Sequence, residues 1–264
     1  PPPEPDAPDD ARVEAAADEL GFPQAVAEGL RAIHTYSAHM AKECLSAQAF
    51  SFRTEEFVSR YALPGYTSWL QSCDMTPAYR MHRRVLQVLQ LRMPPRRWVL
   101  KSPVHLQALP ELAATYPDAR FVFTHRDPTP VLASVSSLVA TLRSAFSDQV
   151  DPIAIGRYHL ELYGNSLDRL VDHVDGLLAS SPVAHVRHED LLTDPAATVE
   201  RVYEELGIDR SAAAGAALDD EIGAGRDRED RAGAHRYDLA DFGLSPADTT
   251  EPFRRYRRRF LEAA

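Results

Sequence analysis

Five polar side chains, each able to bind an anion or move a proton, follow two short apolar runs of the chain. Lys101, Ser102 and His105 follow the first run, and His125 and Arg126 follow the second. Lysine and arginine supply the positive charge that a phosphate or sulfate requires. Serine and histidine add hydrogen bonds, and a histidine can also accept a proton. These residue types, in two groups, predict a site for a multiply charged anion.

Each group belongs to the same local pattern, a short apolar strand that leads directly into a helix. The first predicted strand is Trp98–Leu100 and the second is Ala119–Thr124. Ser102 and Asp127 stand at the predicted N-cap positions, and each is followed by a proline, which favours a first helical turn. Apolar strands joined through helices predict a parallel sheet covered on both faces. Ligands bind such sheets at the carboxyl ends of the strands, beside helix N-termini.

The pattern occurs a third time later in the chain. Val183–Val186 is predicted to be a buried strand that ends on Arg187–Asp190, and Asp194 is predicted to cap a helix that ends at Gly207. The segment Gly223–Arg236 is rich in glycine and charge and is predicted to be a mobile loop. Further helices are predicted from apolar periodicity between Asp10 and Ala38, over Tyr66–Leu91, over Ile153–Leu178 and over Ser245–Ala264.

The composition is that of an acidic globular protein. The chain has 264 residues, of which 44% are hydrophobic and 26% are charged, so it can bury a sizeable core as one domain. The formal net charge of −10 argues against a general nucleic-acid binder, which would need a basic face. A protein this acidic must concentrate its positive charge locally in order to bind a multiply charged anion.

The two cysteines, Cys44 and Cys73, show neither metal-ligand spacing nor the density of a disulfide framework. We therefore expect reduced thiols and a cytoplasmic protein. No apolar run approaches the length of a membrane span, so no transmembrane segment is expected. The carboxylates show no ligand pattern, so no metal is expected either. A homo-oligomer is left open.

Three separated motifs give the chain a resemblance to a known family. WVLKSPVHL, THRDPTPVLASVSSL and VRHEDLLTDPAATVERVYEELGI occur in this order. Together they resemble the sulfotransferase superfamily, in its broad bacterial branch, over roughly Pro64 to Phe260. The resemblance implies a three-layer α/β fold, a parallel sheet flanked by helices, of the P-loop nucleotide-kinase type. It also implies the donor 3′-phosphoadenosine 5′-phosphosulfate, whose product is 3′-phosphoadenosine 5′-phosphate.

The resemblance also implies roles for single residues. Lys101 would contact the transferred sulfuryl group, and Ser102 would add a neutral donor beside it. Arg126 and Ser134, eight residues apart, would hold the 3′-phosphate of the donor. His188, where the cytosolic branch has a tyrosine, would stack on the adenine. The family closes a basic segment over the 3′-phosphate, and Arg236 in His-Arg-Tyr is the best match in the bacterial branch. These assignments predict the donor site.

The proton acceptor is predicted by position and chemistry. In the cytosolic branch the base is a histidine two residues after the lysine, but Pro103 occupies that place here. His105 lies two residues further on, in the first turn of the predicted helix. A helix N-terminus disfavours the imidazolium form, so His105 should be neutral and able to accept a proton near pH 7. Acidic residues stay open as alternatives.

One departure from the family concerns the start of the sequence. The family opens with a strand and a Gly-rich loop that cradles the 5′-phosphosulfate, whereas the first glycine here is Gly21 and no apolar strand precedes it. We expect one sulfotransferase-like domain over 1–264 from whose sequence this strand and loop are missing. The chain is interpreted as a fragment because the later motifs are intact.

The predicted function is transfer of a sulfuryl group to a hydroxyl of a small molecule, lipid or carbohydrate. Two alternatives stay open: a non-catalytic nucleotide-binding or interaction module on the same fold, and a phosphotransferase. The latter would need a Walker-type Gly-Lys-Ser/Thr and acidic magnesium ligands, and the sequence shows neither. Phe50, Phe52 and Phe57 fit either an acceptor pocket or core packing, and core packing is favoured because aromatic residues are usually buried.

Overall fold

The computed structural model describes residues 13–18, 41–229 and 237–262. The chain divides into two compact units, the first formed by Pro1–Pro117 with Ser137–Asp151 and the second by Asp118–Ser136 with Pro152–Ala264. Helix α8 (Pro128–Ser144) contributes residues to both units. The single domain predicted over the chain stays a prediction. Of the helices predicted between Asp10 and Ala38, residues 13–18 are helical and the rest lies outside the described residues.

The first unit consists of helices and connecting segments in its described part. The predicted helix Tyr66–Leu91 is split in two, because Pro77 lacks the N–H that a continuous helix needs and occupies the first turn of a second helix. His82 is buried, although it lies in a run of basic residues that usually forms a solvated face of a helix. The elements are α3 (Leu45–Ala49), α4 (Glu55–Arg60), α5 (Pro64–Leu70), α6 (Thr76–Gln90), the 3₁₀ helix η1 (Pro103–Gln107) and α7 (Leu109–Thr115).

The first predicted strand, Trp98–Leu100, is wrong. These residues have no regular secondary structure, and Val99 is 94% exposed. A strand needs a neighbour that pairs its backbone N–H and C=O groups. Within the described part of the chain, strand pairing joins only β1 (Phe121–His125) and β2 (Val183–Arg187). The apolar run therefore shows strand propensity without a partner strand.

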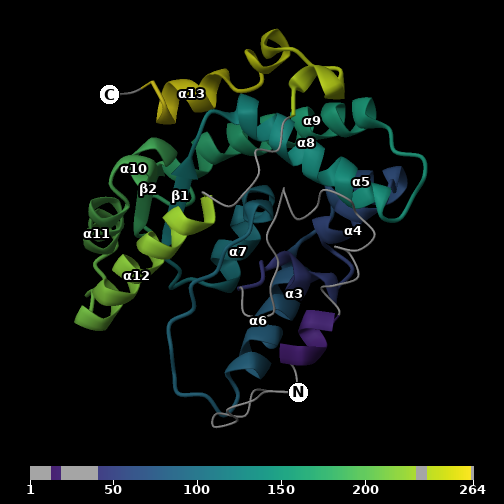
Figure 1. Cartoon of the computed structure of the whole chain (residues 1–264). Coiled ribbons are helices and arrows are strands. Elements are labelled where there is room, and N and C mark those ends of the chain that lie inside the picture. The colour runs from purple at the N-terminus through teal and green to yellow at the C-terminus, as the bar shows by residue number, and fades with distance from the viewer. Residues whose placement is uncertain (1–12, 19–40, 230–236, 263–264) are drawn as a thin grey trace. The chain divides into compact units, whose positions relative to one another are not determined.

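The other two predicted strands form, and they lie side by side in the second unit (Figure 1). β1 and β2 are parallel, with Phe121 opposite Val183 and His125 opposite Arg187. The connection between them runs through α8 and α9 (Pro152–Asp175), as a parallel pair requires. Only one face of β1 is buried, since Val122 and Thr124 are exposed, so the prediction that both faces of the sheet are covered is wrong for this strand.

Helix α11 (Pro195–Glu205) begins and ends where its sequence predicts. The Asp194 carboxylate accepts a hydrogen bond from the Ala197 N–H at 3.0 Å and caps α11. Gly207 follows this helix in the left-handed region, with φ of 58°, which favours glycine. The remaining helices of the unit are α10 (His188–Thr193), α12 (Ala212–Glu229), η2 (Leu239–Phe242), η3 (Pro246–Thr249) and α13 (Arg254–Phe260).

Two predictions near the C-terminus are wrong. The predicted loop Gly223–Arg236 is helical up to Glu229, because it continues α12 from an alanine-rich start with high helix propensity; residues 230–236 lie outside the described part. The predicted helix Ser245–Ala264 is broken into η3 and α13. Pro252, which cannot continue a helix interior, separates the two segments. Phe253, Tyr256 and Phe260 are buried and form part of the core of the second unit.

Candidate functional site

Lys101 lies in the first unit, after the irregular segment 98–100, and its side chain is exposed. Its ammonium group forms a close ion pair with the Glu43 carboxylate. The backbone is tied at the same place, where the Cys44 N–H donates to the Lys101 carbonyl at 3.2 Å. Glu43 and Cys44 therefore hold Lys101 through both its side chain and its backbone.

Ser102 does not cap a helix with its side chain, contrary to its predicted role. Its backbone is extended, but the hydroxyl oxygen is buried and has no hydrogen-bond partner within the described part of the chain. The helix that follows is the five-residue 3₁₀ helix η1, not the start of a longer α-helix. A buried hydroxyl without a partner is a costly arrangement that a ligand or water can relieve.

His105 is neutral at pH 7, although for a different reason from the predicted one. Burial, followed by the proximity of His82, lowers the pKa of His105 to about 4. The His105 Nδ1 atom lies 2.9 Å from the Tyr79 hydroxyl, and the two rings are stacked. Burial raises the pKa of Tyr79, so that its hydroxyl keeps its proton. His105 can therefore accept a proton at Nε2 only in the tautomer whose Nδ1–H donates to Tyr79.

A second histidine extends this cluster. The His82 Nδ1 atom lies 2.6 Å from the Tyr116 hydroxyl, and burial lowers the pKa of His82. Its Nε2 atom is buried and has no hydrogen-bond partner among the described residues. The His82 and His105 rings meet edge to face with centroids 6.2 Å apart. The sequence signal for this cluster was weak, because His82 falls within a run of basic residues that is usually solvated.

Arg126 lies in the second unit, in the turn between β1 and α8, and is exposed. The next residue caps α8 as predicted, since the Asp127 carboxylate accepts a hydrogen bond from the Thr129 N–H at 2.9 Å. The first turn of a helix presents N–H groups that lack partners within the helix. Ser134, half-buried, lies about 9 Å along α8 from Pro128 at 1.5 Å per residue.

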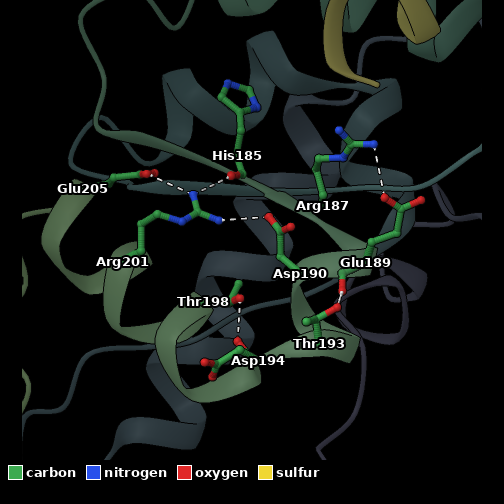
Figure 2. A network of polar contacts seen from close by, with 9 residues as sticks. All are labelled: His185, Arg187, Glu189, Asp190, Thr193, Asp194, Thr198, Arg201 and Glu205. Carbon is green, nitrogen blue, oxygen red and sulfur yellow. Dashed lines mark hydrogen bonds and ion pairs between the residues drawn. The ribbon is translucent and has the colours of Figure 1, made fainter. Parts of the chain in front are cut away.

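His188, half-buried, is the first residue of α10 and directly follows β2. Figure 2 shows how the segment around it is held. Arg201 donates to the His185 carbonyl at 3.1 Å and contacts Glu205 at 3.0 Å and Asp190 at 3.4 Å. This single guanidinium group connects β2, α10 and α11. The start of α10 is thereby fixed relative to the end of β2.

The strand register relates the predicted residues of the second unit to one another. His125 is opposite Arg187, so Arg126 and His188 each follow a paired position at the same end of two adjacent strands. Ser134 follows on the helix that begins beside Arg126. Lys101, Ser102 and His105 belong to the first unit, and Arg236 lies outside the described residues.

Three arginines of α13 make contacts that the sequence did not indicate. In the structure Arg255, Arg257 and Arg259 each bind aspartates far away in the sequence. The four-residue spacings of Arg255 and Arg259 and of Asp168 and Asp172 were the signal for paired helix faces.

Cys44 and Cys73 are both free, and burial raises the pKa of Cys44 to about 11. Across residues 13–18, 41–229 and 237–262, no group of three or more histidine, cysteine, aspartate or glutamate side chains is arranged to hold a metal ion. Within the same ranges, no helix is both long and apolar enough to cross a membrane.

Curated and solved proteins similar to this chain are sulfotransferases. Over 116 residues the chain is 28% identical to the omega-hydroxy-beta-dihydromenaquinone-9 sulfotransferase Stf3 of Mycobacterium bovis and of Mycobacterium tuberculosis. The matched segment spans 42% of this chain and 28% of each relative.

Among solved structures, the chain is similar to the sulfotransferase STF1 from Mycobacterium tuberculosis, with a TM-score of 0.78 and 30% identity over 96% of this chain and 66% of that one. STF9 from Mycobacterium avium gives a TM-score of 0.76 at 23% identity, over 96% of this chain and 64% of that one. These likenesses confirm the predicted α/β fold class. A model of the sulfotransferase family matches residues 3–212, most of the chain, and the chain therefore belongs to the sulfotransferase family.

Proposed function

We propose that this chain binds 3′-phosphoadenosine 5′-phosphosulfate and transfers its sulfuryl group to a hydroxyl. The observation that carries the proposal is the turn in which the exposed Arg126 directly precedes the capped N-terminus of α8. A helix N-terminus favours an anion, and a guanidinium group can grip a phosphate through two parallel hydrogen bonds. We assign the 3′-phosphate to Arg126 and Ser134, stacking on the adenine to His188, and closure over the phosphate to Arg236.

The transfer itself needs positioning and charge neutralisation. The acceptor oxygen forms a bond to sulfur while the bond from sulfur to the bridging phosphate oxygen breaks, and the hydroxyl proton passes to a base. Negative charge grows on the leaving phosphate, where a compact ammonium group is most effective. We assign this role to Lys101, with the Ser102 hydroxyl as a neutral donor. The buried, unpartnered state of that hydroxyl supports the assignment.

His105 is the proposed base, and the structure sets a condition on it. Its Nδ1 atom is occupied by Tyr79, so the proton must arrive at Nε2. The pKa of about 4 keeps the imidazole neutral and ready to accept a proton at any pH above that value. The acid limb of the rate profile should therefore lie near pH 4 rather than near the ordinary histidine value of about 6.5.

The donor site is tested by calorimetric titration of 3′-phosphoadenosine 5′-phosphate into the wild type, Arg126→Ala and Arg210→Ala. Arg126→Ala should weaken binding by about 2 kcal/mol, roughly thirty-fold in Kd, because it removes a charged contact. Arg210 pairs with Glu200 at 3.2 Å on the surface of the same unit, so its loss should leave the affinity unchanged. A folded wild type that does not bind would contradict the proposal.

Transfer is then tested with donor labelled in its sulfuryl group. Movement of label to an acceptor by the wild type, and its loss in Lys101→Ala, would support an enzyme. Binding without transfer to any acceptor would favour the non-catalytic nucleotide-binding module instead.

We further place the protein in the cytoplasm, in keeping with its two free thiols.

We propose a lipid-like acceptor in particular. The curated relative is named for a hydroxylated dihydromenaquinone. In the first unit of this chain Phe50 and Phe52 are 69% and 71% exposed, so the prediction that they pack in the core is wrong. Phe57, by contrast, is half-buried, and its ring centroid lies 5.8 Å from that of Phe52. Phe52→Ser should raise the KM for a hydroxylated isoprenoid quinone and leave that for a sugar alcohol unchanged.

A further inference from the structure

We propose that Arg257 is a positioning residue for the donor site, through which the C-terminal helix α13 holds the turn that carries Arg126. The proposal rests on the proposed contact between Arg126 and the 3′-phosphate. Helix α13 lies beyond the residues that the family model matches, which end at 212. All the contacts that follow lie within the second unit.

Arg257 binds both sides of the turn. Its Nη2 atom contacts the Asp127 carboxylate at 2.8 Å and also contacts the Thr129 hydroxyl. Its Nη1 atom donates to the Thr249 carbonyl at 3.2 Å. A planar guanidinium group can make these contacts at once, whereas a lysine ammonium cannot reproduce the fork. Arg257 therefore connects α13 and η3 to the residues on either side of Pro128.

The surroundings of Arg257 fix it in this orientation. Its side chain is only 19% exposed, and its Nε atom is buried without a partner in the described part of the chain. The guanidinium carbon lies 5.8 Å from the centre of the Phe253 ring. The Thr129 and Thr249 hydroxyls are 2.9 Å apart, so the two threonines close the contact from both sides. A forked set of contacts from one largely covered guanidinium group restricts movement more than a single exposed ion pair does.

Tyr256, the residue before Arg257 in α13, contacts the last residue of β1, as does Phe260. The Tyr256 hydroxyl lies 2.9 Å from the His125 Nδ1 atom. The Phe260 ring stacks on His125 with centroids 4.3 Å apart. Tyr256 and Arg257 together therefore contact the residues on either side of Arg126, which are His125 and Asp127.

The consequence for ligand binding is geometric. Arg126 is exposed, but the residues before and after it are held by α13. The backbone from which its guanidinium group projects is therefore fixed before a ligand arrives. Misplacement of a positioned group by about 1 Å can cost on the order of a hundred-fold in function. Loss of Arg257 should thus weaken phosphate binding without removing any atom that touches the phosphate.

The same helix provides a matched control. Arg255 contacts Asp168 at 2.7 Å and Asp172 at 2.6 Å, both on α9, and no contact joins it to the turn in the described residues. Arg255→Gln and Arg257→Gln each remove one charge and one set of aspartate contacts from α13. Only Arg257→Gln removes contacts with Asp127 and Thr129 beside Arg126.

The test is calorimetric titration of 3′-phosphoadenosine 5′-phosphate into the wild type, Arg255→Gln, Arg257→Gln, Arg257→Lys and Arg126→Ala, with thermal unfolding of each. We expect Arg257→Gln and Arg257→Lys to bind about ten-fold more weakly and Arg255→Gln to bind as the wild type does. Arg257→Lys keeps the charge and so serves if the glutamine variant does not fold.

A double variant separates positioning from direct contact. In the Arg126→Ala background, Arg257→Gln should cause no further loss, because its effect passes through Arg126. Additive losses would mean that Arg257 meets the phosphate itself, and unchanged affinity in both Arg257 variants would mean that α13 does not position the turn; either result overturns the inference. If the wild type itself fails to bind, the proposed function is what fails, and the inference falls with it.

Discussion

The two segments that carry the proposed positive charges are held in different ways. Arg126 follows a strand that is paired along its length and precedes a helix capped by Asp127, and side chains of α13 contact the residues on either side of it. Lys101 follows a segment without regular structure, precedes a short 3₁₀ helix, and is held by one backbone hydrogen bond and the ion pair with Glu43.

This difference fits the two tasks proposed for the segments. A group that binds the constant 3′-phosphate of the donor gains from a fixed backbone, because less order has to be created on binding. A lysine that follows charge as it moves from sulfur to the leaving oxygen needs side-chain freedom. Because the Glu43 contact is largely exposed, it costs little to exchange for a ligand.

The largest expected effect is a difference in unfolding free energy between variants of two corresponding apolar residues, one in each segment. Phe123, on β1, is buried, and its ring centroid lies 5.8 Å from that of His185, whereas Val99 is 94% exposed. Phe123→Ala should lower the free energy of unfolding by about 3 kcal/mol, and Val99→Ala by less than about 0.5 kcal/mol. Urea unfolding of both variants checks this. A loss above about 1 kcal/mol in Val99→Ala would show that the segment is packed in solution.

The same contrast explains what the sequence could predict. The Asp127 and Asp194 caps and Gly207 were predicted because each depends on residues close by in the chain. β1 and β2 were predicted from their apolar runs, and each has the other as its pairing neighbour. The sequence also predicted the strand ends that carry Arg126 and His188. These are the parts of the fold and the site for which local chemistry is sufficient.

Several of the failures depend on partners far away in the chain. Trp98–Leu100 has the composition of a strand, but strand formation needs a pairing neighbour. Arg255 and Arg257 meet aspartates 83 and 130 residues away, which charge pattern alone does not identify. The exposure of Phe52 likewise depends on packing, since hydrophobic type alone does not decide burial.

The second prediction concerns pH, and it compares the histidines of the two segments. Burial lowers the pKa of both His105 and His125 to about 4, whereas an unfolded histidine titrates at about 6.5. Between these values the unfolded chain binds protons that the folded chain does not. The free energy of unfolding should therefore be highest above pH 6.5 and fall as the pH drops toward 4, by up to about 1.4 kcal/mol per pH unit for each histidine.

Substitution of each histidine by phenylalanine measures how much of this pH dependence of the unfolding free energy that histidine causes. His125→Phe keeps a ring to stack on Phe260, and His105→Phe keeps one to stack on Tyr79. Each should remove part of the slope between pH 6.5 and 4.5, measured by urea unfolding at several pH values, and His82 and His185, whose pKa values burial also lowers, should account for a remainder. A slope that is unchanged in both single variants and in the double variant would mean that neither His105 nor His125 is held neutral by folding.

The smallest expected effect compares the two predicted caps. The Asp127 carboxylate caps α8 and binds Arg257; burial alone would raise its pKa, but the Thr129 N–H and Arg257 lower it below the ordinary value. The Ser102 hydroxyl is buried without a partner in the described residues. Asp127→Ala should therefore cost about 1–2 kcal/mol of unfolding free energy, whereas Ser102→Ala should be neutral or stabilising by less than about 1 kcal/mol.

Asp127→Asn sharpens this comparison because it keeps the cap acceptor and removes the charge. If it recovers most of the stability lost in Asp127→Ala, the hydrogen bond to Thr129 is the main contribution; if it recovers little, the contact with Arg257 is. A Ser102→Ala variant as unstable as Asp127→Ala would show that the hydroxyl has a partner in solution. In the expected case the Ser102 variant keeps its stability and loses sulfuryl transfer, because the hydroxyl that we propose as a hydrogen-bond donor to the ligand has no partner among the described residues.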